Sequence, residues 1–293
     1  MPRAEQLTDP ELDHGEGPQW FAEFGTWRCV DMLRGDVVGL DASGRIVRNN
    51  IGSVAAMIRP RTLGGAVILR EHDVVTVGGD PLQARDFRQV AQLLNDPLVR
   101  MNEGACDPVG RLVCGSMAYD MHEGGASVYR ITMGDHGDAA RVETLREAVT
   151  ISNGIAFTAD GSVAYYVDTS TSRIEMIDYS GGSFSSASTL IDLHDESGAP
   201  DGLCIDDEGN LWVAMFGGGC VLAISPTGVI VERIELPTTQ VTACAFAGDD
   251  LDELIITTST LHIPGGRVSQ PLAGAIFTYW PGRRGAPVLA FGR

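Results

Sequence analysis

The sequence contains no lysine, because all 21 basic residues of the 293-residue chain are arginine. A Schiff-base lysine, a pyridoxal phosphate anchor and a Walker A lysine are therefore excluded. Two further catalytic patterns are absent, the G-x-S-x-G nucleophile elbow and the H-E-x-x-H zinc motif. If this chain is an enzyme, its chemistry depends on other residue types.

Positive charge and long apolar runs are also scarce. The 39 acidic residues give a net charge of −18, and a surface of this kind repels nucleic-acid phosphates and anionic lipids. No apolar run approaches the ~18 residues that a membrane-spanning helix needs. The first segment, MPRAEQLTDPELDHGEG, is acidic and lacks the apolar centre of a secretory signal. We therefore expect no nucleic-acid partner and no membrane partner.

The six cysteines include no C-x-x-C pair, and four of them stand in apolar, strand-like stretches such as GLCID and TACAF. This pattern favours buried free thiols over disulfides. Together with the missing signal segment, it predicts a cytoplasmic protein.

Helical periodicity is rare, and only LQARDFRQVAQLLN, residues 82–95, predicts a helix. Elsewhere short apolar runs are cut by Gly, Asp, Asn or Pro, which indicates strands and turns. Gly110, Gly161 and Gly209 recur about fifty residues apart, each before an apolar strand. This period is typical of a propeller blade with four strands. We predict an all-β, six-bladed β-propeller that forms a single domain over residues 1–293, with a metal site in its central channel.

Polar residues recur at one phase of this repeat. Asn102, Asn153 and Asp201 each stand eight residues before one of the repeated glycines. Matching positions of successive blades converge near the axis of a propeller, although the alternative is that each residue only forms a turn. Glu16, in DHGEGPQW, would add a second carboxylate from a surface turn rich in glycine and proline. Such oxygen donors suit Ca²⁺, Mg²⁺ or Mn²⁺, and open coordination positions would also admit Zn²⁺.

Several segments in order resemble the SMP-30/gluconolactonase/luciferin-regenerating-enzyme family: GEGPQW, RMNEGACDPVGRLVCGSM, ISNGIAFTADGSVAYYVDT, PDGLCIDDEGNLWVAMFGGG, CAFAGDDLDELIITTS and QPLAGAIFTY. The resemblance implies a six-bladed propeller with a divalent metal at its centre, and hydrolysis of a lactone, typically a sugar lactone. It also implies site residues. The metal ligands would be Glu16, Asn153 and Asp201, and the substrate contacts would be Arg100, Asn102 and Asp120.

The sequence departs from this family at three places. Glu103 stands where the family has Asp, Ser116 replaces a usual Thr, and Ala275 replaces a usual Gly. Glu103 could reshape the substrate pocket. Of the histidines near the motifs, His14 is expected to be an exposed turn residue, and His122 is a weaker candidate for the mouth of the channel.

The expected function is a metal-dependent lactonase that hydrolyses an aldonolactone, such as gluconolactone, to the open-chain acid. Asp201 would be both ligand and general base, and the alternative is that the cation itself activates the water. One divalent ion is expected, with Ca²⁺ as first choice and Zn²⁺, Mn²⁺, Mg²⁺ or Fe²⁺ as alternatives. A non-catalytic calcium-binding propeller and a broader esterase or phosphotriesterase are the competing functions. The expected partner is a small lactone, bound by a monomer or a small homo-oligomer.

Overall fold

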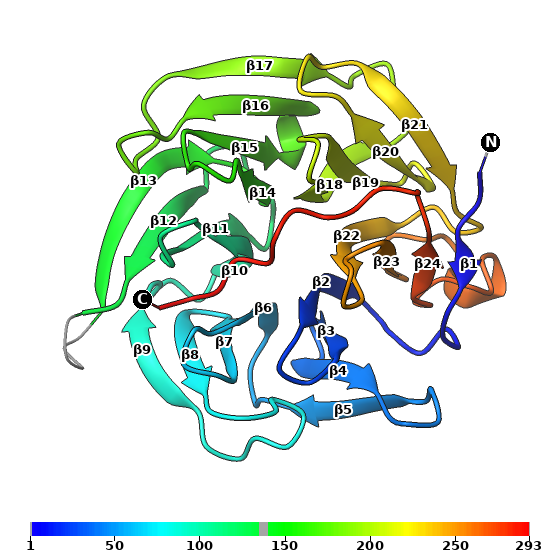
Figure 1. Ribbon diagram of the computed structural model, residues 1–293, viewed down its shortest axis with the longest axis horizontal. Coiled ribbons are helices and arrows are strands. Elements are labelled where there is room, and N and C mark those ends of the chain that lie inside the picture. The colour runs from blue at the N-terminus through cyan, green and yellow to red at the C-terminus, as the bar shows by residue number, and fades with distance from the viewer. Residues whose placement is uncertain (1, 135–139, 293) are drawn as a thin grey trace.

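The computed structural model describes residues 2–134 and 140–292, and it forms six four-stranded antiparallel sheets around a central axis (Figure 1). The prediction of an all-β, six-bladed propeller is confirmed. Within the described ranges no α-helix forms, and the two short 3₁₀ helices are η2 (Thr169–Thr171) and η3 (Gly266–Val268). No helix in this part of the chain is long and apolar enough to cross a membrane.

Each blade is a meander whose first strand lies nearest the axis. The first three blades contain β2 (Gly15–Phe21), β3 (Thr26–Asp31), β4 (Asp36–Leu40) and β5 (Ile46–Asn50); β6 (Ala55–Pro60), β7 (Ala66–Arg70), β8 (Asp73–Val77) and β9 (Arg88–Gln92); and β10 (Val99–Cys106), β11 (Leu112–Ala118), β12 (Ala126–Thr132) and β13 (Arg141–Val149). The fourth and fifth contain β14 (Ser152–Phe157), β15 (Val163–Asp168), β16 (Arg173–Asp178) and β17 (Ala187–Asp192); and β18 (Ala199–Ile205), β19 (Leu211–Phe216), β20 (Cys220–Ile224) and β21 (Ile230–Glu235).

Both ends of the chain build the sixth blade. Its order is β22 (Val241–Ala247), β23 (Glu253–Thr258), β24 (Phe277–Tyr279) and then β1 (Glu5–Gln6) on the outside. Glu5 pairs with Thr278, and Gln6 pairs with Phe277. Because the N-terminal strand completes the last sheet, the ring is closed by hydrogen bonds between the two ends of the chain.

Apolar side chains fill the space between neighbouring blades. Val30, Met57 and Met101, from three successive blades, are fully buried in one cluster. Between the fifth and sixth blades, the rings of Trp212 and Phe246 meet edge to face with centroids 5.7 Å apart. The alternating side chains of each strand thus pack against the blades on either side.

The segment 82–95 corrects one prediction, because it forms no helix. Residues 88–92 form strand β9, which pairs with β8 as the outermost strand of the second blade. Leu82, Phe87 and Val90 are partly buried against the core. Their spacing imitates a helix face, but the open edge of β8 supplies backbone partners that a helix would forgo.

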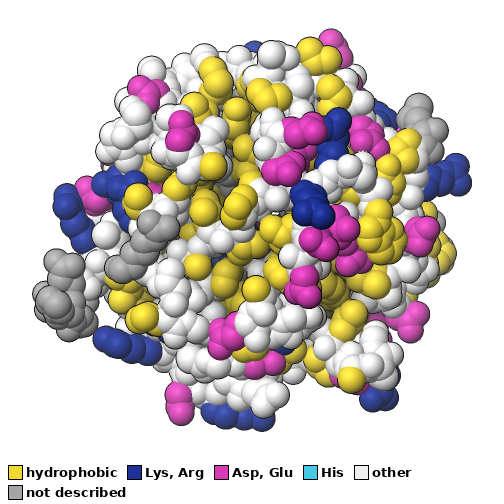
Figure 2. Space-filling model, viewed as in Figure 1, with side chains coloured by type: hydrophobic (Ala, Val, Ile, Leu, Met, Phe, Trp, Pro, Cys, Tyr) yellow, Lys and Arg dark blue, Asp and Glu magenta, His cyan; other side chains and the backbone are white. Residues whose placement is uncertain are grey.

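The C-terminal segment, residues 283–292, crosses one mouth of the channel (red in Figure 1). The Asp207 backbone N–H donates to the Arg284 carbonyl at 2.9 Å, and the Gly292 N–H donates to the Gly110 carbonyl at 2.8 Å. The segment therefore spans from the fifth blade to the third. We call this end of the channel the tail-side mouth. Figure 2 shows this face, with hydrophobic side chains around its centre and a group of acidic and arginine side chains beside them.

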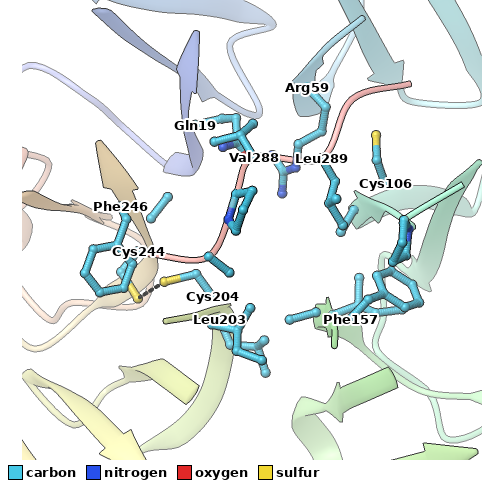
Figure 3. A pocket seen from close by; sticks show the side chains of 18 of the residues that line it. Gln19, Arg59, Cys106, Phe157, Leu203, Cys204, Cys244, Phe246, Val288 and Leu289 are labelled. Atoms are coloured by element: carbon cyan, nitrogen blue, oxygen red, sulfur yellow. Dashed lines mark hydrogen bonds between the residues drawn. The ribbon is translucent and has the colours of Figure 1, made fainter. Parts of the chain in front are cut away.

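A cavity of about 290 Å³ lies beneath the C-terminal segment (Figure 3). Its walls are mainly apolar and include Phe157, Leu203 and Leu289, with Gln19 and Arg59 as polar members. Two of the six cysteines, Cys204 and Cys244, also line it, with their sulfurs 3.9 Å apart. All six cysteines are free thiols, as predicted.

A glycine on the inner strand β14 tests how tightly the blades approach at the axis. A Cβ on Gly154 would lie 2.6 Å from the Asp201 carbonyl oxygen and 2.8 Å from the Leu203 nitrogen. Because both atoms are backbone, we expect Gly154→Ala to destabilise the fold by about 1–3 kcal/mol. The measurement is denaturant unfolding. Gly181→Ala is the control, since a Cβ there meets nothing within 4 Å.

Candidate metal centre in the central channel

Every inner strand breaks register with its neighbour at the same level of the propeller. The breaks fall between Glu16 and Gln19, Ala55 and Met57, Met101 and Glu103, Ser152 and Ile155, Pro200 and Leu203, and Val241 and Ala243. Such β-bulges re-aim side chains that the regular alternation would send between the blades. The four predicted residues Glu16, Asn102, Asn153 and Asp201 all lie at these bulges, and Ala56 and Thr242 occupy the same place in the other two blades.

The segment DHGEGPQW is therefore mainly a strand, and the expectation of a surface turn is wrong. Residues 15–21 form β2, and Glu16 is only 4% exposed. The turn-forming residues Gly17 and Pro18 lie in the bulge of this strand instead. Gly17 has φ +54°, and Pro18, which has no N–H, falls inside the break in pairing, where no ladder donor is needed.

Two carboxylates are buried together at the bulge level. Glu16 and Asp201 are 4% and 5% exposed. Burial, and then the charges of Asp201 and Glu103, raise the pKa of Glu16 well above its usual range. Burial, followed by the charge of Glu103, does the same to the pKa of Asp201. Asp201 Oδ1 has no hydrogen-bond partner in the described part of the chain.

The Asn153 amide is anchored through its nitrogen, and a hydrogen bond from this side chain partly offsets the rise in the pKa of Asp201. Asn153 Nδ2 donates to Thr169 Oγ1 at 3.0 Å, and the Thr169 hydroxyl donates to the Pro200 carbonyl at 2.8 Å. Thr169 begins the 3₁₀ helix η2, directly after β15. This chain of two hydrogen bonds links the Asn153 amide to the strand that carries Asp201.

These residues fit a divalent cation. Two buried carboxylates that repel each other, one of them with an unpaired oxygen, would be neutralised by such an ion, and an amide oxygen is a further hard ligand. In residues 2–134 and 140–292, no three His, Cys, Asp or Glu side chains form a metal-binding group. The predicted trio contains only two side chains of those types, with the Asn153 amide as the third donor.

Arg100 and Asn102 form a fixed pair beside this centre. Arg100 Nη1 donates to Asn102 Oδ1 at 2.6 Å, and Asn102 Nδ2 donates to the Ser152 carbonyl at 2.9 Å. Both polar ends of the Asn102 amide are thus engaged. The Arg100 guanidinium also lies 5.9 Å from the Tyr119 ring centroid. Asn102 therefore orients Arg100, and the arginine is the better placed of the two to meet a ligand.

Glu103 points to the other side of the bulge. Its Oε1 accepts from Arg59 Nη2 at 3.0 Å and from the Gly104 N–H at 2.8 Å. Because Arg59 lines the tail-side cavity, this ion pair lies between that cavity and the carboxylates. Glu103 affects Asp201 through its charge.

The last predicted substrate residue, Asp120, lies apart from the buried group. It is exposed on the loop between β11 and β12, where its Oδ1 lies 2.6 Å from Nδ1 of His122, which is also exposed. Arg100 pairs with Met117 at the end of β11, so this loop flanks the same mouth. We call this the site mouth.

His14 is buried, so the expectation of an exposed turn histidine is wrong. It is 7% exposed, and its Nδ1 lies 2.8 Å from Ser259 Oγ. Its Nε2 lies 3.7 Å from Glu16 Oε1. Burial, with the charges of Arg100 and His262, lowers the pKa of His14 to about 3, which keeps the imidazole neutral. Sequence reasoning also missed Thr169, whose role depends on contacts with two other segments.

Fold and site together define a β-propeller with a candidate cation centre in its channel. Comparison with known proteins agrees, since residues 14–260 match the family model described as SMP-30/Gluconolactonase/LRE-like region. The chain belongs to this family.

Relatives and solved structures span nearly the whole chain. Regucalcin of Danio rerio is 32% identical over 90% of this chain and 89% of its own length. A Bacillus subtilis protein, provisionally named sugar lactone lactonase YvrE, is 31% identical over 90% of both chains. The crystal structure of a calcium-binding protein, regucalcin, from Agrobacterium tumefaciens has a TM-score of 0.90 at 26% identity and covers 100% of this chain and 98% of its own.

The Thr169 hydroxyl is testable as a positioning group. We expect Thr169→Val to weaken divalent-cation binding about fivefold, the equivalent of one hydrogen bond of ~1 kcal/mol, because the Asn153 amide loses its anchor. Thr169→Ser, which keeps the hydroxyl, should restore the affinity. Calorimetric titration with Ca²⁺ and Mn²⁺ measures both, and equal affinities in all three proteins would contradict this role.

The buried carboxylates should make the cation-free protein pH-sensitive. A carboxyl whose pKa is raised on folding stabilises the fold at low pH and loses that contribution as the pH rises through the raised pKa. We therefore expect Glu16→Gln to raise the cation-free unfolding temperature at pH 8, by about 2–4 °C per ~1 kcal/mol regained. The gain should shrink towards pH 5. Thermal unfolding in chelator checks it, and a loss of stability at pH 8 would contradict it.

Proposed function

We propose that this protein is a metal-dependent lactonase that opens a sugar lactone, such as gluconolactone, to its acid. One observation carries the proposal: buried Glu16 and Asp201, with the Asn153 amide, lie in a channel beside a buried arginine, Arg100. The names of similar proteins support it, since they include sugar lactone lactonase. The family description also contains gluconolactonase.

Glu16, Asn153 and Asp201 would hold the cation, with Ca²⁺ as first choice and Zn²⁺, Mn²⁺, Mg²⁺ or Fe²⁺ as alternatives. When bound, the cation would polarise the lactone carbonyl and stabilise the negative charge that develops on its oxygen. Asp201 would accept the proton of the attacking water. Because a bound cation lowers the pKa of its carboxylate ligand, the proton would go to the Asp201 oxygen that does not hold the cation, and the alternative is that the cation itself activates the water.

Arg100 distinguishes this proposal from a purely calcium-binding protein. A structural calcium site needs oxygen ligands and gains nothing from a buried guanidinium within reach of its carboxylates. In a lactonase, the same group can hold the carbonyl or the hydroxyls of the substrate. Asn102 fixes Arg100 at 2.6 Å, which suits a positioned substrate contact. Asp120, on the exposed rim loop, would complete the contacts from outside.

The central test is acid release from a panel of aldonolactones, each assayed with a panel of divalent metals and with chelator. We expect a metal-dependent rate on at least one hydroxylated lactone after spontaneous hydrolysis is subtracted. Absence of such a rate on the whole panel would contradict a lactonase and favour a calcium-binding propeller. A higher rate on simple esters or phosphotriesters than on lactones would favour the broader hydrolase.

Variants of the two carboxylates separate binding from chemistry. We expect Glu16→Gln to weaken metal binding by at least ~10-fold and to lower activity with it, since a ligand is lost. Asp201→Asn should lower kcat by ~100-fold or more at saturating metal. Asp13→Asn is the control, because the Asp13 side chain is half-buried away from the carboxylate pair and its ion pairs are with Arg34 and Arg267. Full turnover by Asp201→Asn with normal metal binding would contradict its role as base.

A further inference from the structure

A second ring of residues lies one step closer to the site mouth than the bulge ring. It consists of the residue two positions before each bulge residue, namely His14, Val54, Arg100, Ile151, Ala199 and Gln240. Two of these side chains demonstrably reach towards the bulge residue of their own strand. Arg100 Nη1 lies 2.6 Å from Asn102 Oδ1, and His14 Nε2 lies 3.7 Å from Glu16 Oε1. Gln240 holds the same register in the sixth blade.

The Gln240 side chain is buried without a partner for its amide oxygen. Gln240 is 7% exposed, and Oε1 makes no hydrogen bond within the described residues. Its backbone is fixed, because the Gln240 carbonyl accepts from the Ser259 N–H at 2.9 Å. Gln270 provides a contrast, since its Oε1 accepts from the Thr238 hydroxyl at 2.9 Å and the Thr239 N–H at 2.8 Å. A buried acceptor without a partner destabilises a fold, and Gln240 Oε1 is one of only four such buried side-chain atoms in the described part of the chain.

Gln240 lies against the loop after β19, because it forms an antiparallel bridge with Phe216. Gly217, on the loop after β19, is the residue beside Gln240 Oε1, and a Cβ there would lie 3.7 Å from that oxygen. Phe216 meets His262 with ring centroids 6.3 Å apart, and the charge of His262 acts on His14. The amide therefore belongs to the same mouth as the imidazole beside Glu16.

Arg100 and Gln240 hold the same position of the repeat on opposite sides of the channel. Arg100 lies on β10, and Gln240 directly precedes β22. These are the inner strands of the third and sixth blades, which are opposite one another in a six-bladed ring (Figure 1). A ligand above the carboxylates would thus meet a cationic donor on one side and a neutral amide on the other. An amide both donates and accepts, as a hydroxyl does, so the pair suits a neutral polyol.

We propose that Gln240 is a substrate-binding residue whose amide takes a hydroxyl of the lactone, and that it makes the site selective for hydroxylated lactones over plain alkyl lactones. The lactone part of this proposal rests on the proposed function above. A site that pairs its buried amide with a substrate hydroxyl discriminates against an analogue that lacks the hydroxyl, because the amide then remains unpaired.

The test compares gluconolactone with δ-valerolactone, which has the same six-membered ring without hydroxyls. We expect Gln240→Leu to lower kcat/KM for gluconolactone about tenfold and to leave δ-valerolactone within twofold. Gln19→Leu is the matched control, because Gln19 lines the tail-side cavity at the other end of the channel. It should leave the ratio of the two rates unchanged. Gln240→Met is a second variant of similar size, used if Gln240→Leu does not fold by circular dichroism.

Binding without turnover separates this inference from the lactonase proposal. Calorimetric titration with glucose, a stable six-membered polyol, should show weaker binding to Gln240→Leu than to wild type in the presence of Ca²⁺. If no lactone is hydrolysed but this difference is found, the lactonase proposal fails and the Gln240 subsite stands. If the two lactone rates change in parallel or not at all, and the variant and wild type do not differ in glucose binding, Gln240 is not a substrate-binding residue.

Discussion

The repulsion between two buried carboxylates is the interaction around which the channel is organised. Glu16 and Asp201 come from different blades, and burial together with their mutual charge raises the pKa of Glu16. Neighbouring groups relieve part of this cost. The charge of Arg100 stabilises both ionised forms, and Arg59 pairs with the third acid, Glu103. Since Asp201 keeps one oxygen unpaired, a cation is the remaining partner that the donor set suits.

One structural feature, a bulge that recurs in each inner strand, brings these charged side chains to the channel. A regular strand would alternate its side chains between the two neighbouring blades, and none would reach the axis. The bulge breaks this alternation at one level, so the blades can each present one side chain to the channel. Ala56 and Thr242 show that the bulge is first a structural feature, because Ala56 has no polar atom and the Thr242 hydroxyl is bonded to the Gly15 carbonyl and lies 2.9 Å from Thr257 Oγ1.

Local sequence patterns predicted the repeat well and the individual environments less well. The spacing of Gly110, Gly161 and Gly209 reflects turns that need positive φ, and these angles are +84°, +70° and +85°. The shared phase of Asn102, Asn153 and Asp201 follows from the same repeat. Glu16 was a candidate from the sequence alone, but its assignment as a metal ligand came from the family resemblance, because glycine and proline around it indicate a turn by local rules. Its strand exists because β3 pairs with it, and this contact is invisible in the segment itself.

Contacts between distant segments explain the other misses. The burial of His14 depends on Ser259, and the orientation of Asn153 depends on Thr169. Both partners are the last residues of family-like segments, ISNGIAFTADGSVAYYVDT and CAFAGDDLDELIITTS, but nothing within these segments predicts the two contacts. Gln240 is different, because its phase in the repeat could have been read from the sequence once the position of Arg100 was matched between blades. The sequence does not predict that the Gln240 side chain is buried, and an unpaired amide is informative only where water cannot satisfy it.

The two mouths of the channel are not equivalent, so a ligand would approach the carboxylates from only one of them. The C-terminal segment covers the tail-side mouth, and the Arg59–Glu103 ion pair lies between its cavity and the carboxylates. At the site mouth, Arg100, His14 and Gln240 surround the approach to Glu16 and Asp201. A ligand that enters there meets polar groups first and the carboxylates last. Because Glu16, Asp201 and Arg100 are buried, the electrostatic interactions among them are stronger than in water, and hydrolysis of a bound ester would depend on such interactions.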